Sequence, residues 1–199
     1  PTAPIHDPKH HPMLGRLAWP SAVIRGFRLG SMTSHNYTQS ESAQQSFLEV
    51  FRRHGAGVSI VTLNKPSGEP TGFTATSLSS LSLLPPRASF NMSIMASSYP
   101  AISSRESLLI HTLSVDNLDL AKQFSGEASE RFSGIELLAG PDGLPLLPGC
   151  SGYMHGRIVE RHVIGDAAMI AVEILSGGVA SDANALVYQH QDYRAATEL

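Results

Sequence analysis

Short runs of apolar and β-branched residues, separated by glycine, proline and small polar residues, extend through most of this 199-residue chain. Two such runs near the middle are joined by a Lys-Pro-Ser-Gly-Glu turn, which is typical of a β-hairpin. A second hairpin is expected late in the chain, where Gly165-Asp166 separates two long runs of strand-forming residues. The pattern as a whole predicts strands at residues 58–64, 71–78, 87–94, 108–113, 152–163, 167–177 and 186–188.

Helical periodicity is found in three shorter segments. Between Phe47 and His54, apolar side chains recur at steps of three and four residues, which predicts a helix. Ser40 or Ser42 is expected to cap its N-terminus, and the glycines that follow His54 end it. Two small helices are predicted at residues 99–106 and 116–124.

Many short strands with few small helices favour a mainly β fold, namely an antiparallel Greek-key barrel decorated by helices. A doubly wound α/β fold is disfavoured because too few strands alternate with crossover helices. We expect residues 41–199 to form this single domain.

Residues 1–40 have a different composition and are interpreted as an N-terminal extension. They are rich in proline, histidine and arginine, and Asp7 is their only acidic residue. The segment is either an Arg-rich targeting peptide or a cloning remnant that ends before Met32, and we favour the remnant. Its histidines, His6, His10 and His11, lack a fixed fourth ligand and do not predict a metal site.

Composition narrows the classes of function. The chain is 42% hydrophobic and 16% charged, with a formal net charge of −3 and no basic stripe, which argues against nucleic-acid binding. The single cysteine, Cys150, excludes an internal disulfide and suits a reducing, cytoplasmic compartment. No apolar run approaches the roughly 18 residues of a membrane span.

A row of small hydroxyl residues occupies positions 71–86. Alternation along the first half places Phe73 and Ala75 on one face and Gly72, Thr74 and Thr76 on the other. Serines then alternate with leucines until two prolines end the segment. The hydroxyls offer donors to an anion or to a polar ring edge, and glycine permits close approach. An ordinary serine-rich turn is the alternative interpretation.

This segment, Gly-Phe-Thr-Ala-Thr-Ser followed by Ser-Leu-Ser-Leu and Pro-Pro, resembles the flavin-contacting segment of the flavin reductase-like family, the FMN-binding split barrels. The resemblance extends over residues 45–194 and includes the pieces 51–62, 87–91, 120–126 and 131–135, in order. It implies a homodimeric split β-barrel that binds flavin noncovalently. It also implies reduction of FMN, or of FAD, by NADH or NADPH.

The resemblance assigns two groups of candidate residues. The nicotinamide co-substrate is assigned to Gly165, Asp166, His162 and Tyr193. Lys122 and Arg131 are the candidate partners of the flavin phosphate, although a helix and a loop commonly carry such residues at the surface. The complete flavin-binding set is Thr74, Ala75, Thr76, Ser77, Ser80, Ser82, Asn91, Ser93, Ser97, Ser98, Lys122 and Arg131.

Two departures from the family pattern affect the nicotinamide site. The family commonly has Gly-Asp-His between its late strands, whereas Ala167 follows Gly165-Asp166 here. His162 is a candidate to reach the same space, and a solvated strand-end histidine is the alternative. The closing histidine is displaced by one residue to His190, which on a strand would turn it to the opposite face.

The sequence therefore favours an NAD(P)H-dependent flavin reductase that supplies reduced flavin to a partner monooxygenase. Such an enzyme needs no acid, base or nucleophile, because the cofactor carries the reactivity. A flavin- or haem-binding split barrel without reductase turnover is the alternative, motivated by Ala167, and a ligand-free structural dimer is the third possibility. A catalytic role for Cys150 is not expected. A metal site formed by His155 and His162 is not expected either, because the two histidines are seven residues apart on one strand and therefore lie on opposite faces.

Overall fold

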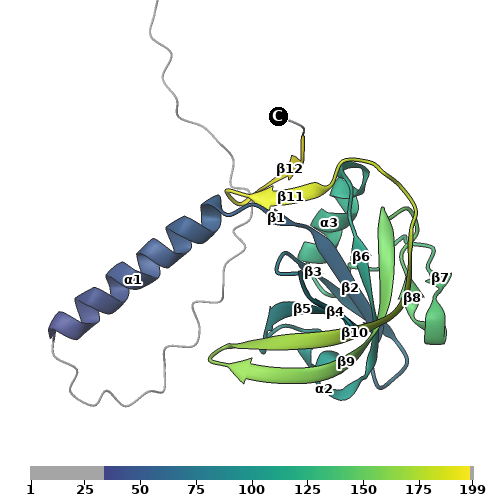
Figure 1. The fold of residues 1–199 in the computed structure, drawn as a ribbon, viewed down its shortest axis with the longest axis horizontal. Helices are drawn as coiled ribbons and strands as arrows, with labels where there is room; N and C mark the ends of the chain where they lie inside the picture. Colours follow the sequence, from purple (N-terminus) through teal and green to yellow (C-terminus); the bar gives the residue numbers. More distant parts are fainter. Residues whose placement is uncertain (1–33, 198–199) are drawn as a thin grey trace, which may run out of the picture. The chain divides into compact units, whose positions relative to one another are not determined.

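The computed structural model describes residues 34–197, with side chains from Ser42 onward, and the chain from Ser46 onward forms one compact unit (Figure 1). Helix α1 (Ser34–Arg53) begins before Ser40 and Ser42, so the prediction that one of these serines caps it is wrong. Polar residues extend the helix beyond its apolar periodicity, which is why the pattern missed its first turns. The boundary expected between residues 40 and 41 falls within α1 and stays a prediction. The targeting or cloning interpretation rests on residues 1–32, which lie outside the described part.

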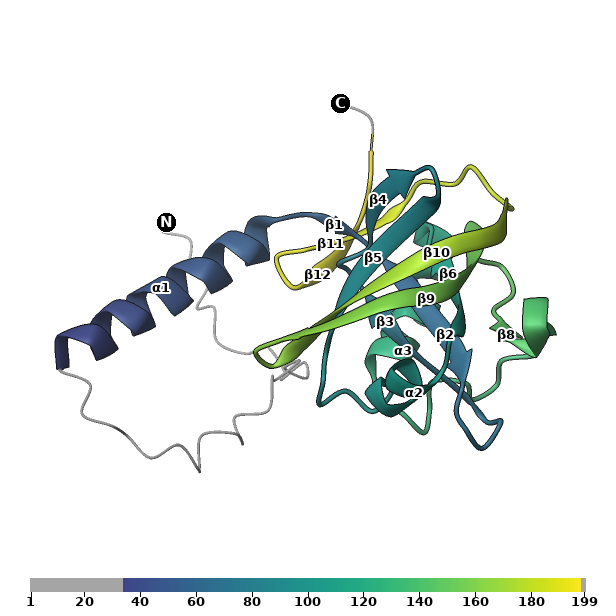
Figure 2. The ribbon, with the colours of Figure 1, turned by 60° about the horizontal axis from the view of Figure 1, so that its bottom comes forward.

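One antiparallel sheet of seven strands dominates the fold, in the order β3-β2-β6-β9-β10-β5-β4. Strands distant in sequence, such as β5 and β10, therefore lie side by side in a strongly twisted sheet (Figure 2). This confirms the mainly β fold, whereas the closure of the sheet into a split barrel stays a prediction. The strands are β2 (Ser59–Asn64), β3 (Pro70–Ala75), β4 (Ser79–Leu83), β5 (Pro86–Ser93), β6 (Ser107–Thr112), β9 (Gly152–Ile164) and β10 (Ala167–Val179).

Two small sheets complete the strand pairing. One joins β1 (Ala56–Gly57) to β11 (Leu186–Gln189), which pairs in turn with β12 (Asp192–Ala195). The other pairs β7 (Leu138–Ala139) with β8 (Pro145–Leu146). The sequence pattern did not separate β4 and β12 as strands, because β4 is exposed along its whole length and β12 is only four residues long.

The small helices agree with the prediction within a few residues. They are α2 (Tyr99–Ser104), the 3₁₀ turns η1 (Val115–Asn117) and η2 (Pro141–Gly143), and α3 (Leu118–Ser125). A capping box precedes α3, in which Asn117 Oδ1 accepts hydrogen bonds from the backbone N–H and the hydroxyl of Ser114. Among the described residues, no helix combines the length and the apolar character needed to cross a membrane.

Strand β3 shows how the core positions the hydroxyl segment. Phe73 and Ala75 are buried, Thr74 is half-buried and Thr76 is exposed, which confirms the predicted alternation. Gly72 has a different role from the one expected. A Cβ atom there would lie 2.7 Å from the carbonyl oxygen of Val61 and 3.0 Å from the ring of Phe124. The missing side chain therefore lets α3 pack closely on the sheet, rather than admitting a ligand.

A bulge in β9 changes the faces of its histidines. Arg157 pairs with Glu173 and Glu160 pairs with Ala171, so the four residues 157–160 on β9 correspond to the three residues 171–173 on β10. The extra residue brings His155 and His162 onto the same face of the sheet, so the prediction of opposite faces is wrong. The turn at the end of this hairpin is as expected, with Gly165 at a φ of 62°.

His111 holds the segment that includes β7 and β8 against the sheet. The imidazole is fully buried, with Nδ1 3.2 Å from the carbonyl oxygen of Ile60, and Nε2 accepts the backbone N–H of Leu147 at 3.1 Å. These contacts require a neutral imidazole with its proton on Nδ1. Burial lowers the pKa of His111 to about 4, and the hydrogen bond to Ile60 opposes this effect only in part.

Candidate functional site

The hydroxyl of Thr74 marks the centre of the candidate flavin site. It donates to the carbonyl oxygen of Ala121 in α3 at 3.2 Å, and the Tyr193 hydroxyl approaches the same oxygen at 3.4 Å. The ring of Tyr193 is held edge-on against Tyr188, with centroids 5.2 Å apart. The structure thus brings together β3, α3 and the C-terminal β12 strand. The sequence assigned Thr74 and Tyr193 separately and gave no signal that they meet.

A second group of hydroxyls lies along β4 and β5. Ser77 donates to the carbonyl oxygen of Asn91 at 3.1 Å and accepts the Asn91 backbone N–H at 2.8 Å, which closes the start of the β4–β5 hairpin. Ser93 Oγ accepts the N–H of Met95. Ser80 and Ser82 are exposed on β4, and Ser82 donates to the carbonyl oxygen of Pro85.

Arg131 connects the third group of predicted residues. Its Nη1 donates to the Gly72 carbonyl oxygen at 2.7 Å and to the Ser97 hydroxyl at 3.3 Å, while Nε and Nη2 donate to the carbonyl oxygen of Gly126. The guanidinium therefore ties β3 to the end of α3 and to the loop before α2. Ser98 is fully buried in this cluster and donates to the Gly72 carbonyl oxygen, which indicates a structural contribution.

Positive charge at this cluster lacks a close counter-charge. Within the described part of the chain, no carboxylate lies within 4.0 Å of the Arg131 or Lys122 side chain. Burial lowers the pKa of Arg131, and the nearby charge of Glu127 opposes that shift. A partly buried guanidinium that makes only carbonyl and hydroxyl contacts favours an anion beside it. Lys122 is exposed on α3 and is free to approach the same anion.

The predicted nicotinamide residues fall into two places. Gly165 and Asp166 form the tip of the β9–β10 hairpin, where the Asp166 carbonyl oxygen accepts the N–H of Ile94 at 3.1 Å. Ala167 pairs directly with Ser93, so the position that departs from the family pattern lies beside a candidate flavin residue. Tyr193 instead lies beside Thr74, at α3.

Two histidines named by the sequence have clear positions. His162 is exposed on β9, and its Nε2 lies 2.7 Å from Glu160 Oε2. His190 occupies the turn between β11 and β12 with a φ of 54°, so the expectation that it reverses its face on a strand does not apply.

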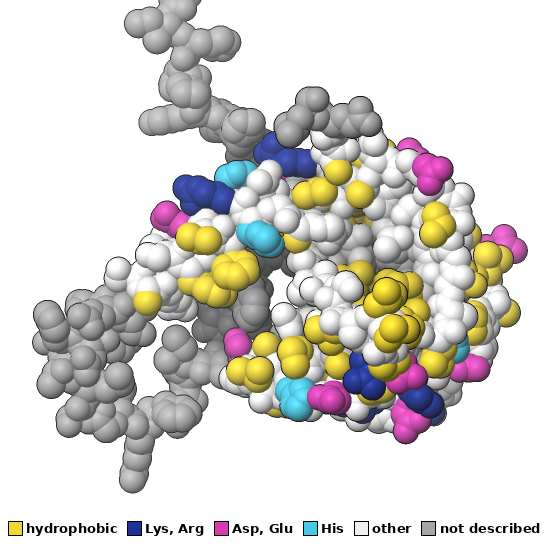
Figure 3. All heavy atoms as spheres, in the orientation of Figure 1, with side chains coloured by type: hydrophobic (Ala, Val, Ile, Leu, Met, Phe, Trp, Pro, Cys, Tyr) yellow, Lys and Arg dark blue, Asp and Glu magenta, His cyan; other side chains and the backbone are white. Residues whose placement is uncertain are grey.

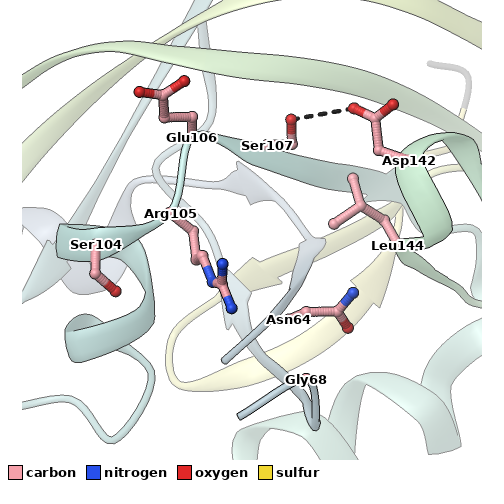
Figure 4. A pocket seen from close by; sticks show the side chains of 8 residues that line it. All are labelled: Asn64, Gly68, Ser104, Arg105, Glu106, Ser107, Asp142 and Leu144. Atoms are coloured by element: carbon pink, nitrogen blue, oxygen red, sulfur yellow. Dashed lines mark hydrogen bonds between the residues drawn. The ribbon is translucent and has the colours of Figure 1, made fainter. Parts of the chain in front are cut away.

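A polar cavity of about 480 Å³ opens away from these groups (Figure 4). It lies where the β2–β3 turn, the end of α2 and η2 meet, and none of the predicted site residues lines it. Ser107 donates to Asp142 Oδ2 in its wall, and His155 Nε2 contacts the same oxygen at 3.1 Å. The lining residues are Asn64, Gly68, Ser104, Arg105, Glu106, Ser107, Asp142 and Leu144.

Cys150 is buried, and burial raises the pKa of its thiol to about 11. A thiol in this state is a poor nucleophile near neutral pH. This agrees with the expectation that it takes no part in catalysis.

Comparison with known proteins gives a consistent result. The model of the flavin reductase like domain matches residues 51–197. An NADH:FMN oxidoreductase of Rhodococcus qingshengii is 42% identical over 122 residues, and the match covers 61% of this chain but only 63% of the relative. The FMN reductase (NADH) RutF of Stutzerimonas stutzeri is 30% identical over 152 residues, which cover 75% of this chain and 87% of the relative. Among solved structures, a flavin reductase domain protein from Arthrobacter sp. FB24 is 40% identical with a TM-score of 0.75, over 78% of this chain and 97% of that one.

Proposed function

Because the chain belongs to the flavin reductase-like domain family, we propose that it is an NADH-dependent flavin reductase that uses FMN. The observation that carries the proposal is that the Arg131 guanidinium binds the carbonyl oxygen of Gly72 on β3, the same strand that carries the Thr74 hydroxyl. One end of the site offers donors to a polar ring edge, and the other offers a cation to a phosphate. This combination fits FMN, which contains both groups.

The residues of this site bind and orient rather than exchange protons. FMN, when bound, would supply the redox chemistry as the acceptor of hydride from the nicotinamide. Thr74 and the linked pair of Ser77 and Asn91 hold the polar ring edge, where donors stabilise negative charge. Arg131 and Lys122 face the phosphate, and Ser97 adds a hydroxyl. NADH approaches over the hairpin tip at Gly165 and Asp166.

A second candidate function is flavin binding without turnover, and Ala167 is the observation that favours it. A small apolar side chain at this position provides no hydrogen bond to a nicotinamide. The two candidates predict the same FMN affinity but opposite responses to NADH.

We further propose that the protein closes into a homodimeric split barrel. Several large apolar side chains are exposed on the β4–β5 hairpin and on the β9–β10 hairpin. They include Leu83 and Leu84, which are 81% and 91% exposed, and Val163 and Ile164. Hydrophobic side chains also gather along α1 (Figure 3). A second copy of the chain would cover such surfaces, with an interface of roughly 2,000 Å² or more.

Reduced flavin is the product of the proposed reaction, and we propose that a partner monooxygenase consumes it. The NADH:FMN oxidoreductase and FMN reductase relatives support the formation of reduced FMN, the product on which this proposal depends. The partner itself is not identified by the chain.

One experiment tests the proposed function. FMN is added to the purified protein under nitrogen, its binding is measured by fluorescence quenching, and NADH is then added while the flavin absorbance is followed. Binding and bleaching are expected for a reductase. Binding without bleaching would favour the second candidate, and no binding would remove both.

A further inference from the structure

We propose that His162, oriented by Glu160, accepts a hydrogen bond from the nicotinamide carboxamide, and that Glu160 is a positioning residue of the reductase. The inference rests on the proposed function and assigns Glu160 a role in it. The two side chains are two residues apart on β9 and share one face of the sheet. His162 Nε2 lies 2.7 Å from Glu160 Oε2, and both side chains are more than half exposed.

The position of the pair on the sheet connects it to the candidate flavin site. His162 pairs with Met169, and Met169 pairs with Asn91. One row nearer the hairpin tip, Ala167 lies between Ile164 and Ser93. The imidazole therefore shares a face with Asn91 and Ser93, and it is diagonal to Ala167, which leaves open space there.

The contact with Glu160 determines which imidazole nitrogen faces a ligand. An ionised carboxylate only accepts hydrogen bonds, so Nε2 carries the proton. The pKa of Glu160 is lowered, chiefly by its hydrogen bond to His162, which keeps the carboxylate ionised. Nδ1 has no partner within the described residues and is the acceptor of the neutral ring. A primary carboxamide supplies the matching N–H donor.

Other charged groups near this face do not replace the pair. Arg87 and Arg157 both contact Glu173, at 3.8 and 3.4 Å, so both cations on β5 and β9 already have a carboxylate partner on β10. Asp166 at the hairpin tip adds an exposed carboxylate. Within the described part of the chain, Nδ1 of His162 is thus an unused acceptor on this face.

The test is steady-state NADH oxidation at saturating FMN. His162→Ala is expected to raise the KM for NADH roughly threefold to tenfold with kcat retained, as for the loss of one hydrogen bond. Glu160→Gln is expected to raise the KM for NADH by a similar factor. The new amide can donate a hydrogen bond to Nε2, which moves the ring proton to Nδ1, and Nδ1 then no longer accepts from the carboxamide. His162→Asn places an oxygen near the position of Nδ1 and should restore most of the affinity.

Glu69→Gln is the matched control, since Glu69 forms an exposed pair with Lys65 at 3.1 Å on the β2–β3 turn, and no change is expected. An unchanged KM in both His162→Ala and Glu160→Gln overturns this inference alone. A weakened FMN affinity with unchanged NADH kinetics overturns it in favour of a flavin contact. Absence of NADH oxidation in the parent overturns the proposed function as well.

Discussion

The hydroxyls of Thr74 and Tyr193 converge on one acceptor, the carbonyl oxygen of Ala121, at 3.2 and 3.4 Å. Ala121 lies inside α3, so its carbonyl also belongs to the hydrogen-bond pattern of the helix. The two hydroxyls and the helix N–H together make three donors, which is more than the two lone pairs of a carbonyl oxygen readily accept. One hydroxyl can therefore turn to a ligand acceptor without leaving Ala121 unsatisfied.

Replacing Thr74 and Ser77 together by leucine should abolish FMN binding while the protein remains folded. The change removes both donors and adds bulk where the flavin ring is expected to lie. FMN titration and circular dichroism check the result, and Ser103→Leu on exposed α2 is the control. FMN affinity equal to that of the parent would show that the site lies elsewhere.

Arg131→Met should weaken the binding of FMN more than that of riboflavin, which lacks the phosphate. It should also lower the free energy of unfolding by at least about 1.5 kcal/mol, because the carbonyls of Gly72 and Gly126 lose a charged donor. Lys122→Met is the comparison, since that side chain is exposed and should affect FMN affinity without affecting stability. Calorimetric titration and thermal unfolding measure the two effects. Equal losses for FMN and riboflavin would assign Arg131 a purely structural role.

The burial of His111 predicts a loss of stability in acid. Its folded-state pKa of about 4 lies below that of a free imidazole, so the unfolded chain takes up a proton first as the pH falls. The stabilisation is complete above about pH 6.5 and is lost progressively towards pH 4, by about 3 kcal/mol. Urea unfolding of the parent and of His111→Gln at each pH isolates this contribution. Parallel pH profiles for the two proteins would contradict the prediction.

Ala167→His should raise kcat/KM for NADH roughly threefold to tenfold without changing FMN affinity. Ala167 pairs with Ser93, so the new imidazole would lie beside the candidate flavin site. Steady-state kinetics at saturating FMN check the gain. If neither protein oxidises NADH, the candidate function without turnover is supported and the reductase proposal fails.

Replacing Leu83 and Leu84 together by glutamate should convert a dimer into a monomer. Both side chains are exposed within one chain, and charge in an apolar interface is costly to bury. Light scattering at micromolar concentration gives the mass, with Leu138→Glu, about half exposed on β7, as the control. A monomeric parent would remove the proposal of a shared interface.

The sequence predicted most of the elements because their local signals are strong. Residues 71–75 alternate as expected, and Gly165 provides the left-handed turn of the β9–β10 hairpin. The predictions from the sequence that were wrong have physical causes. The bulge near Val159 inserts one residue without any glycine or proline to signal it, so the faces of His155 and His162 were misassigned.

The candidate site was predictable in its parts but not in its assembly. The hydroxyl segment carries a local pattern, whereas the contact of Tyr193 with Ala121 depends on how β12 docks on α3. Gly72 was interpreted through its own flexibility, although the ring of Phe124, far along the chain, determines its role. Tertiary contacts of this kind leave no trace in the local order of residues.

Strand β1 pairs with β11, so an early strand of the compact unit is hydrogen-bonded to nearly its last. During synthesis, Ala56 and Gly57 emerge from the ribosome long before Val187 and Tyr188, and more than half of the chain is made in between. The three-stranded sheet can therefore form only after residues 186–195 have been made, when the larger sheet already has all of its strands. Because β12 of that late sheet carries Tyr193, a nascent or C-terminally truncated chain has Thr74 in place but lacks its neighbour at Ala121.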